Sequence, residues 1–446
     1  MRGHSRRLLY LLFLVIFLLL GTRLLTSRSH LAPPDIDSVV ITHRRGESAR
    51  TAPAYAPGMY MAGRRPANST FCGWNYGLPR SLRYPASRVT RSPQDNGRGP
   101  YRVLPFAIRG GSGARNEKLV KLTLCTHATA DQVYNVVEIV RRWEGHVSLT
   151  IFAPGLDAGL AVDLIERACL CEPEMFKVSV HLIFPAGRPP ALSHVYRPEG
   201  DCAASDLQWR DSDTERKQRG MIYPINMARN VARSLAPSSR VLVSDIELLP
   251  SDKLASGFLE MIHGRPPRSA LIFVVPVFEI EENERPPRTK RELMDAVRSG
   301  VAVYFHKYVC VHCQKFPGIT KWMLRPDPGR VKPLVVTKRE YPHHRWEPVF
   351  IGTREDPLYN EEMSWEGRQD KMVQMLEMCL MNYRLIILDG AFLIHTPGIK
   401  RKPSKPLNKE KPRTFERAQE KRNARIYQSI TRELLKQYPA NQRCRQ

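Results

Sequence analysis

The sequence lacks the patterns by which basic proteins commonly recognise nucleic acid: zinc-finger spacing, an RNA-binding signature and interleaved aromatic and basic residues. Acidic residues are also scarce, with 44 Asp and Glu against 69 Lys and Arg, so the formal net charge is +25. Much of this excess lies at the C-terminus, where residues 400–446 hold 15 Lys and Arg against 4 Glu. These absences exclude a nucleic-acid partner and indicate a solvated basic tail able to face anionic lipid or acidic glycans.

A long apolar run is missing as well. The uncharged run at residues 8–20 is short for a membrane span, and no small-x-small cleavage site lies near its end. Arg2, Arg6 and Arg7 precede the run, which predicts a cytoplasmic N-terminus and a luminal remainder. We therefore expect a cytoplasmic tail (1–7), an uncleaved transmembrane signal anchor (8–25) and a luminal stem rich in Pro, Arg, Ser and Gly (26–116).

Two features agree with a luminal compartment. Asn68 begins the glycosylation sequon Asn-Ser-Thr, and the nine cysteines are compatible with disulfides. Because nine is odd, at least one thiol is free or pairs between chains, and Cys125, in mid-strand, is the candidate for a buried free thiol. Cys310 and Cys313 are a lone Cys-x-x-Cys pair, which predicts a short loop disulfide or two separate bridges rather than a zinc site.

From residue 117 the pattern changes to alternating strands and helices. Strands are expected at 119–125, 147–152, 178–184, 240–243 and 271–280, with helices at 131–143 and 158–170 and another that begins at Pro224. This rhythm predicts an α/β domain over residues 117–400, with a Rossmann-like sheet flanked by helices. The basic tail, 401–446, is expected to form an amphipathic helix at 413–438 that docks on the domain.

Asp245 and Glu247 stand two apart just after the apolar strand 240–243. Carboxylates at positions i and i+2 of an extended segment point to the same side, and ligands of open α/β sheets bind at the carboxyl ends of strands. Such a pair suits Mn²⁺ or Mg²⁺ on the diphosphate of a nucleotide sugar, although a solvated strand end is the plainer alternative. Arg229 and Asn230, on the preceding helix, are predicted to bind the donor, because a guanidinium matches phosphate oxygens; the alternative is an exposed helix face.

The order of these motifs resembles glycosyltransferase family 49, in the form of an invertebrate-type branch. The matching pieces are Tyr-Pro-Ile-Asn-Met-Ala-Arg-Asn-Val-Ala from Tyr223, Val-Ser-Asp-Ile-Glu-Leu-Leu-Pro-Ser from Val243, Val-Val-Pro-Val-Phe-Glu from Val274, Cys-Val-His-Cys from Cys310, Trp-Glu-Pro from Trp346 and Phe-Leu-Ile-His from Phe392. The resemblance runs from about residue 119 to the C-terminus. It implies a GT-A-type fold, a single-pass type II Golgi membrane protein, a UDP-sugar donor and an inverting, Mn²⁺-dependent transfer.

The resemblance also gives roles to further residues. It implies that His395 completes the metal shell of Asp245 and Glu247, whereas a histidine after an apolar strand would otherwise be a core residue. Asp370, at a helix start, and Glu366 are the predicted catalytic bases, although Asp370 is nearly as well explained as a helix cap. The residues expected to contact the acceptor are Trp346, Glu347 and Trp365, of which the two tryptophans would also suit a core.

The reaction that the resemblance implies, and that we favour, is transfer of glucuronic acid, in β-1,4 linkage, to a xylose-terminated glycan during protein O-glycosylation. Residues 359–371 depart from the family's motif, with Asn360 and Glu362 replacing Asp and Arg, which leaves the donor sugar and the acceptor open. Glu247 stands where an Asp-x-Asp motif has its second Asp. This difference motivates a rival hypothesis, in which the protein is a catalytically inactive family member that binds glycans or forms complexes in the lumen. Homo- or hetero-oligomers are compatible with either hypothesis.

Overall fold

The computed structural model describes residues 69–94, 99–111, 117–192, 202, 213–265, 269–401, 414–439 and 441–444. The chain divides into two compact units, Met1–Pro53 and Ala54–Gln446, and the first lies outside the described residues. The predicted signal anchor (8–25) and the sequon at Asn68 also lie outside them. Within the described part of the chain, no helix is both long enough and apolar enough to cross a membrane.

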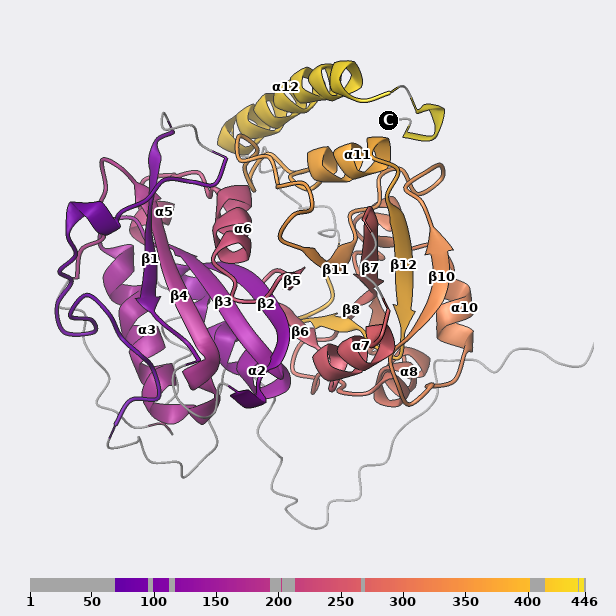
Figure 1. Ribbon diagram of the computed structural model, residues 1–446, viewed down its shortest axis with the longest axis horizontal. Helices are drawn as coiled ribbons and strands as arrows, with labels where there is room; N and C mark the ends of the chain where they lie inside the picture. Colours follow the sequence, from indigo (N-terminus) through magenta and orange to yellow (C-terminus); the bar gives the residue numbers. More distant parts are fainter. Residues whose placement is uncertain are drawn as a thin grey trace, which may run out of the picture. The chain divides into compact units, whose positions relative to one another are not determined.

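A nine-stranded mixed sheet is the centre of the fold (Figure 1). Its strands, in spatial order, are β1 (Tyr101–Ile108), β4 (Val178–Pro185), β3 (Gly145–Phe152), β2 (Val120–Thr129), β5 (Arg240–Val243), β11 (Val349–Thr353), β7 (Leu271–Val275), β12 (Arg384–Asp389) and β10 (Lys332–Thr337). The strands β4, β3, β2 and β5 are parallel, as strand-helix-strand connections require, whereas β11 runs antiparallel to both of its neighbours.

A second sheet has four short strands. Their order is β6 (Leu248–Pro250), β13 (Leu393–His395), β8 (Val277–Ile280) and β9 (Ala302–Tyr304). Three strands of the large sheet continue directly into this one, because β5 is followed by β6, β7 by β8 and β12 by β13. The segment predicted as a single strand, 271–280, is therefore divided between the two sheets, as β7 and β8.

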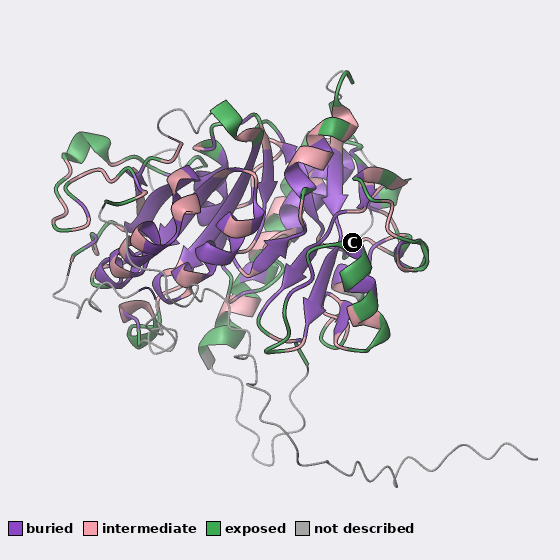
Figure 2. Ribbon diagram, turned by 90° about the horizontal axis from the view of Figure 1, so that it is seen from below, coloured by how far each residue is buried: buried purple, intermediate pink, exposed green. Residues whose placement is uncertain are grey.

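The helices cover the sheets, and the strands between them are mostly buried (Figure 2). They are η1 (Ala86–Arg88), η3 (Ala130–Asn135), α2 (Val136–Arg142), α3 (Asp157–Cys171), η4 (Pro173–Lys177), α5 (Glu215–Gln218), α6 (Ile225–Ser234), α7 (Leu254–Ile262), α8 (Lys290–Arg298), α9 (Val311–Gln314), α10 (Ile319–Leu324), α11 (Met372–Leu380), α12 (Thr414–Gln437) and η5 (Gln442–Cys444). The predicted fold class, an α/β domain with a Rossmann-like mixed sheet flanked by helices, is confirmed.

The α/β domain begins earlier than predicted. β1, which lies inside the segment expected to be stem (26–116), pairs antiparallel with β4 and forms an edge of the large sheet. A disulfide joins Cys72 to Cys169 at the end of α3, so residues near 72 are also fastened to the domain. The boundary at residue 117 is therefore corrected, because a Pro- and Arg-rich composition masked an edge strand that one partner strand suffices to hold.

Three further disulfides join Cys171 to Cys202, Cys310 to Cys313 and Cys379 to Cys444. The short loop disulfide at 310–313 was one of the two predicted alternatives, and Cys125 is buried and unpaired, as expected. The bridge from Cys379 fastens the C-terminal segment to α11. Ile426, Ile430 and Leu434 on α12 pack against the same helix.

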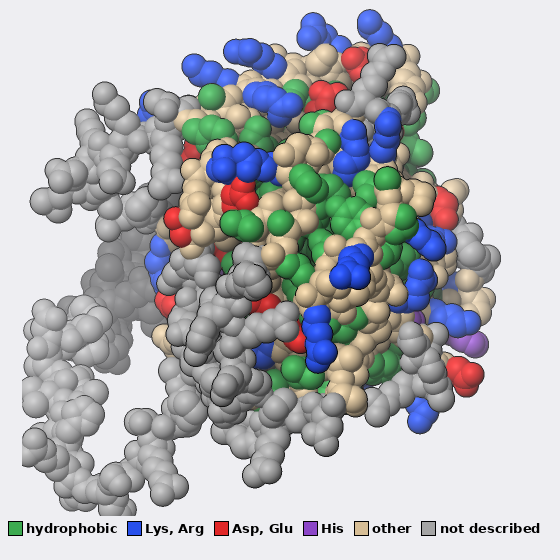
Figure 3. All heavy atoms as spheres, turned by 90° about the vertical axis from the view of Figure 1, so that its left-hand side faces the viewer, with side chains coloured by type: hydrophobic (Ala, Val, Ile, Leu, Met, Phe, Trp, Pro, Cys, Tyr) green, Lys and Arg blue, Asp and Glu red, His purple; other side chains and the backbone are tan. Residues whose placement is uncertain are grey.

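The basic excess is visible on the surface. On the face shown in Figure 3, Lys and Arg side chains stand singly among apolar and acidic ones instead of gathering into one patch. Among the described residues, several surface cations pair with exposed carboxylates, for example Arg288 with Asp252 and Arg298 with Asp295. Exposed pairs of this kind stabilise a protein by only about 0–1 kcal/mol each, so they affect solubility more than fold.

His181 on β4 ties four elements together in the core. Its Nδ1 accepts a hydrogen bond from the Phe106 backbone N–H at 3.0 Å, and its Nε2 lies 3.1 Å from Ser148 Oγ on β3. Ser148 Oγ in turn donates to the carbonyl of Ala232 on α6 at 2.7 Å. The imidazole must therefore be neutral, with its hydrogen on Nε2. Burial, with a smaller contribution from Arg109, lowers the pKa of His181 to about 3.

We predict that His181 makes the protein less stable in acid. Between its unfolded pKa of 6.5 and its folded pKa of about 3, the unfolded chain binds a proton that the folded chain does not. The free energy of unfolding therefore falls as the pH falls through this window. His181→Asn keeps an acceptor near the position of Nδ1 but cannot titrate. The difference in free energy of unfolding between wild type and variant, measured by urea unfolding, should therefore be smaller at pH 5 than at pH 7. The exposed His263→Asn is the control, and an equal gap at both pH values contradicts the prediction.

Candidate active site

Asp245 and Glu247 lie in the short link between β5 and β6, where the chain passes from the large sheet to the small one. The link begins at the carboxyl end of β5, which confirms the position inferred from the sequence. Each side chain is about one-third exposed, at 32% for Asp245 and 34% for Glu247. Both carboxylates are therefore held by the protein and still open to a ligand.

Three cationic or polar side chains surround the carboxylate of Asp245. Its Oδ1 accepts from Arg229 Nη2 at 3.0 Å and from His127 Nε2 at 3.1 Å, and Lys371 Nζ is 3.5 Å from Oδ2. Burial alone would raise the pKa of Asp245, but Lys371, Arg229 and the His127 hydrogen bond together hold it well below the usual value. Asp245 is therefore ionised in any neutral or mildly acidic compartment.

His127 reaches Asp245 from β2, the neighbour of β5. Its Nδ1 lies 2.8 Å from the hydroxyl of Tyr223, and a carboxylate can only accept, so Nε2 donates to Asp245 and Nδ1 accepts from Tyr223. Burial is the main reason that the pKa of His127 is lowered, and Arg229 lowers it further, against the raising effect of Asp245. The chain Tyr223 to His127 to Asp245 thus fixes the orientation of the carboxylate.

Arg229 on α6 is 2% exposed and bridges two carboxylates. Its guanidinium donates to Asp245 and to Asp370, and also to Asn226 Oδ1 at 2.9 Å. Burial alone would lower the pKa of Arg229, but Asp370 and Asp245 raise it. The predicted donor-binding arginine is thus fully engaged within the protein and is placed to hold Asp245.

Asn230 is likewise occupied. It is fully buried, its amide donates to the Tyr359 carbonyl and to Glu361 Oε1, both at 2.8 Å, and its carbonyl accepts from the Tyr359 N–H at 3.0 Å. These bonds fasten α6 to the loop 359–361. Among the described residues, Asn230 therefore contacts this loop rather than the open side of the site.

His395 ends β13 and meets Glu247, because β13 pairs antiparallel with β6. His395 Nε2 and Glu247 Oε2 are 3.1 Å apart, and the Thr396 N–H donates to the Glu247 carbonyl at 3.1 Å. Burial alone would raise the pKa of Glu247, but the hydrogen bond and charge of His395 lower it. Residues 148 positions apart in the sequence are thus brought into contact, as the resemblance implied.

The residues at this edge fit a divalent cation. Among the described residues no three His, Cys, Asp or Glu side chains are already clustered as a metal site. However, Glu247 Oε2 and His395 Nε2 point at each other at 3.1 Å, and the charge of Asp245 acts on Glu247. Carboxylate oxygens and an imidazole nitrogen are ligands that Mn²⁺ accepts. Asp245 would join them by exchanging one protein partner for the ion.

The two predicted bases are both held in ion pairs. Asp370 pairs with the buried Arg229, and its side chain is 14% exposed. Glu366, 7% exposed, accepts from Arg216 Nη2 at 2.9 Å and from the Tyr223 N–H at 3.0 Å. A catalytic role for either carboxylate stays a prediction.

The three predicted acceptor contacts lie in different surroundings. Trp346 is 2% exposed and belongs to the core, which leaves no ring face for a sugar and corrects its predicted stacking role. Trp365 is 57% exposed, so its ring is available at the surface. Glu347 is half-buried and lies two residues before the start of β11.

Sequence reasoning missed His127, Tyr223 and Lys371 as parts of the site. His127 could have been found, because it is a polar residue near the carboxyl end of the strand beside β5. Lys371 directly follows Asp370 at the start of α11. Nothing in the sequence around Lys371 indicates that the start of this helix lies near the end of β5. Its role depends on a contact between segments 126 residues apart.

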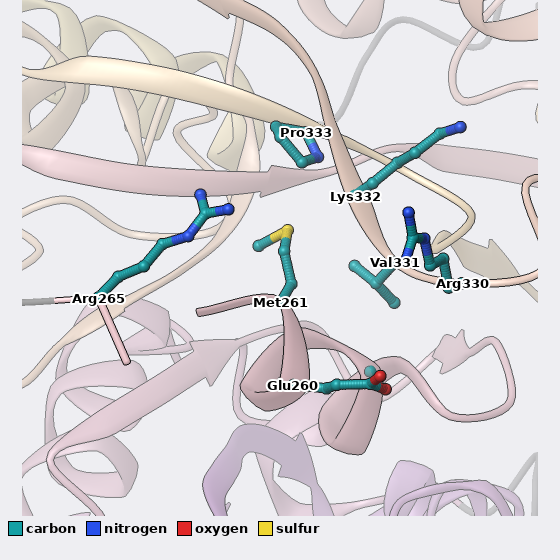
Figure 4. Close-up of a pocket in the computed structure, with 8 residues that line it drawn as sticks. Glu260, Met261, Arg265, Arg330, Val331, Lys332 and Pro333 are labelled. Atoms are coloured by element: carbon teal, nitrogen blue, oxygen red, sulfur yellow. The ribbon is translucent and has the colours of Figure 1, made fainter. Parts of the chain in front are cut away.

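A separate hollow of about 290 Å³ lies between α7 and β10 (Figure 4). Its lining includes the cations Arg265, Arg330 and Lys332, one carboxylate, Glu260, and the apolar Met261. β10 is the far edge of the large sheet, four strands from β5. This hollow therefore does not belong to the Asp245 site.

Open α/β sheets bind their ligands at the carboxyl ends of the strands, and Asp245 and Glu247 lie at this edge, just after β5. Residues 121–439 match the family model described as "Glycosyl-transferase for dystroglycan". The chain therefore belongs to this family of glycosyltransferases.

Curated relatives agree with the family. Beta-1,4-glucuronyltransferase 1 of Danio rerio is 27% identical over 364 residues, which cover 78% of this chain and 82% of that protein. The human protein of the same name is 26% identical over 331 residues, covering 72% and 76%. Xylosyl- and glucuronyltransferase LARGE2 of Rattus norvegicus is 25% identical over 287 residues, covering 62% of this chain and 34% of its own length.

Solved structures give only distant similarity. S. aureus TarS 1-349 aligns with a TM-score of 0.30 at 12% identity, over 62% of this chain and 60% of that one. GalNAc-T7 with UDP, GalNAc and Mn²⁺ aligns with a TM-score of 0.34 at 11% identity, over 65% and 46%. These scores are too low to support further conclusions.

Arg229→Met should destabilise the protein strongly, because it leaves the carboxylates of Asp245 and Asp370 without their shared cation. Removal of one partner of a buried ion pair typically costs about 3–5 kcal/mol. The triple variant Arg229→Met/Asp245→Asn/Asp370→Asn should recover part of this loss, because no unpaired charge is left. Urea unfolding at pH 7 measures both effects. A loss below about 0.5 kcal/mol in the single variant, the range usual for surface substitutions, would show that Arg229 does not hold the site together.

Proposed function

We propose that this protein transfers a sugar from a UDP-sugar to a glycan acceptor with inversion at the anomeric carbon. The favoured donor is UDP-glucuronic acid, and the favoured product is a β-1,4 linkage to a xylose-terminated glycan. The names of the curated relatives support this choice of donor. The observation that carries the proposal is the 3.1 Å contact of Glu247 and His395 beside the ionised Asp245, at the carboxyl end of β5.

In this proposal Asp245, Glu247 and His395 hold Mn²⁺. The ion supplies positive charge that offsets the negative charge on the departing diphosphate. Lys371, 3.5 Å from Asp245, lies within reach of the same phosphates, and the charge of Lys400 lowers the pKa of Glu247. Arg229 and Asn230 serve the donor indirectly, since Arg229 orients Asp245 and Asn230 fixes the loop 359–361. The exposed Trp365 stacks on the acceptor.

The proposed setting is the Golgi lumen, with the chain anchored as a single-pass type II membrane protein. Four disulfides among the described residues support an oxidising compartment. In this organisation residues 1–7 are cytoplasmic, residues 8–25 are the anchor and Asn68 carries a glycan. The acceptor is then a glycoprotein that passes through the same compartment.

The proposal predicts sugar transfer by the purified full chain, assayed with a panel of UDP-sugars and xylose-terminated acceptors in Mn²⁺. UDP-glucuronic acid should be the best donor, and a chelator should abolish transfer. Asp245→Ala should lower the rate at least about a hundredfold, because both the ion and the fixed charge pattern depend on it. Asp252→Ala, which removes a carboxylate from an exposed pair with Arg288, is the matched control. Neither transfer nor hydrolysis with any donor would contradict the proposal.

A second candidate is a non-catalytic protein that binds glycans or forms complexes in the lumen. One observation favours this candidate: Asp245 already contacts Arg229, His127 and Lys371. A Mn²⁺ ion would have to compete with these protein partners for the carboxylate. The two candidates differ in UDP binding. An enzyme should bind UDP more tightly with Mn²⁺ than without it, whereas the non-catalytic protein should show no Mn²⁺ dependence.

A further inference from the structure

Glu347 stands at the carboxyl edge of the large sheet, next to the Asp245 site. β11 is antiparallel to β5 and β7, with Ile351 opposite Leu242 and Val349 opposite Val275. The residues just before β11 therefore run past the ends of β5 and β7, where Asp245 lies. The position is rigid, because Trp346 is buried and the Glu347 N–H donates to the Cys313 carbonyl at 3.0 Å, in the loop closed by the Cys310–Cys313 disulfide.

The carboxylate of Glu347 differs from the others at this edge. Asp245 and Asp370 share Arg229, Glu247 contacts His395, and Glu366 accepts from Arg216. By contrast, Glu347 forms no side-chain hydrogen bond or ion pair with any described residue. It is half-buried, so it is partly removed from water and yet reachable. A carboxylate of this kind has oxygens free to accept a proton from a ligand.

Charges of both signs face Glu347 from several elements. Asp370 and Lys371 act on it from the start of α11, Arg229 from α6 and Asp245 from the link after β5, and Glu347 in turn acts on Arg339. Burial, and next the charge of Asp370, raise the pKa of Glu347 to about 7, against the lowering effect of Lys371 and Arg229. A general base is most effective when its pKa lies near the working pH.

We propose that Glu347 is the catalytic base of the transfer. Its carboxylate takes the proton of the acceptor hydroxyl while that oxygen forms a bond to the anomeric carbon of the donor. The bond between that carbon and the diphosphate oxygen breaks, its electron pair leaves with UDP, and Glu347 later releases the proton to solvent. This assignment rests on the proposed function and gives the reaction its base.

The two bases expected from the sequence are less suited to this step. The Asp370 carboxylate is committed to an ion pair, because its Oδ2 accepts from the buried guanidinium of Arg229. Both oxygens of Glu366 accept from the Tyr223 N–H, at 3.0 and 3.3 Å, and one also accepts from Arg216. Each of these carboxylates is held by protein partners, whereas Glu347 has no side-chain partner among the described residues.

The test compares Glu347→Gln, Glu347→Asp and the control Glu355→Gln, which alters an exposed carboxylate just beyond the other end of β11. Glu347→Gln should lower the transfer rate by about 10²- to 10⁴-fold, the usual effect of removing a general base. Binding of UDP with Mn²⁺ should change by less than about threefold, because Glu347 does not hold the donor. The kcat/KM of the wild-type protein should fall as the pH is lowered below about 7, because protonated Glu347 cannot act as a base. In Glu347→Asp this fall in kcat/KM should occur at a different pH.

A measurement of stability tests the same carboxylate without activity. Because the folded pKa lies above the unfolded value of 4.5, the folded state binds the proton more tightly, and stability falls as the pH rises from about 4.5 to about 7. Glu347→Gln cannot titrate, so its melting temperature relative to wild type should rise across this window. Glu355→Gln should show no such trend.

The outcomes separate the two claims. If wild type transfers sugar and Glu347→Gln transfers it within threefold of wild type with the same acid limb, the assignment is wrong and the proposed function stands. If wild type transfers no sugar, the proposed function is wrong and the assignment fails with it. If transfer is lost together with UDP binding, Glu347 holds the donor instead, and the assignment is again overturned.

Discussion

The structure depends on one constraint, the passage of three strands from the large sheet into the small one. β5, β7 and β12 each end at the same edge and continue as β6, β8 and β13. The antiparallel pairing of β6 with β13 then fixes Glu247 against His395. Because the backbone register sets this contact, the two ligand-type side chains are positioned before any ion or nucleotide arrives, which lowers the entropic cost of binding.

A network of charges stabilises this edge of the sheet and engages most of its carboxylates in contacts within the protein. The buried Arg229 shares its guanidinium between Asp245 and Asp370, and His127 and Lys371 complete the surroundings of Asp245. Such a network holds the pKa of Asp245 well below its usual value, although burial alone would raise it. It also separates the roles of the carboxylates, because the paired ones organise the site and the unpaired Glu347 is left for chemistry.

The sequence predicted the parts of this site that depend on local pattern. The α/β rhythm, the strand at 240–243 and the helix carrying Arg229 are all present, because apolar periodicity and turn residues act over a few positions. Prediction from the sequence was wrong where contacts between distant segments determine the surroundings of a residue. The edge strand β1 has a composition typical of a stem, and Trp346 is buried in the folded core. Asn230 forms its hydrogen bonds with the loop 359–361. The distinction between Glu347 and Asp370 likewise depends on the fold, because Arg229 forms an ion pair with Asp370 and, among the described residues, none with Glu347.

The most direct measurement is a crystal structure of the protein with Mn²⁺ and UDP. The account predicts one ion bound by Glu247 and His395, with Asp245 as a further ligand and the diphosphate of UDP on the same ion. An ion held elsewhere, or a diphosphate bound away from the link between β5 and β6, would contradict the account.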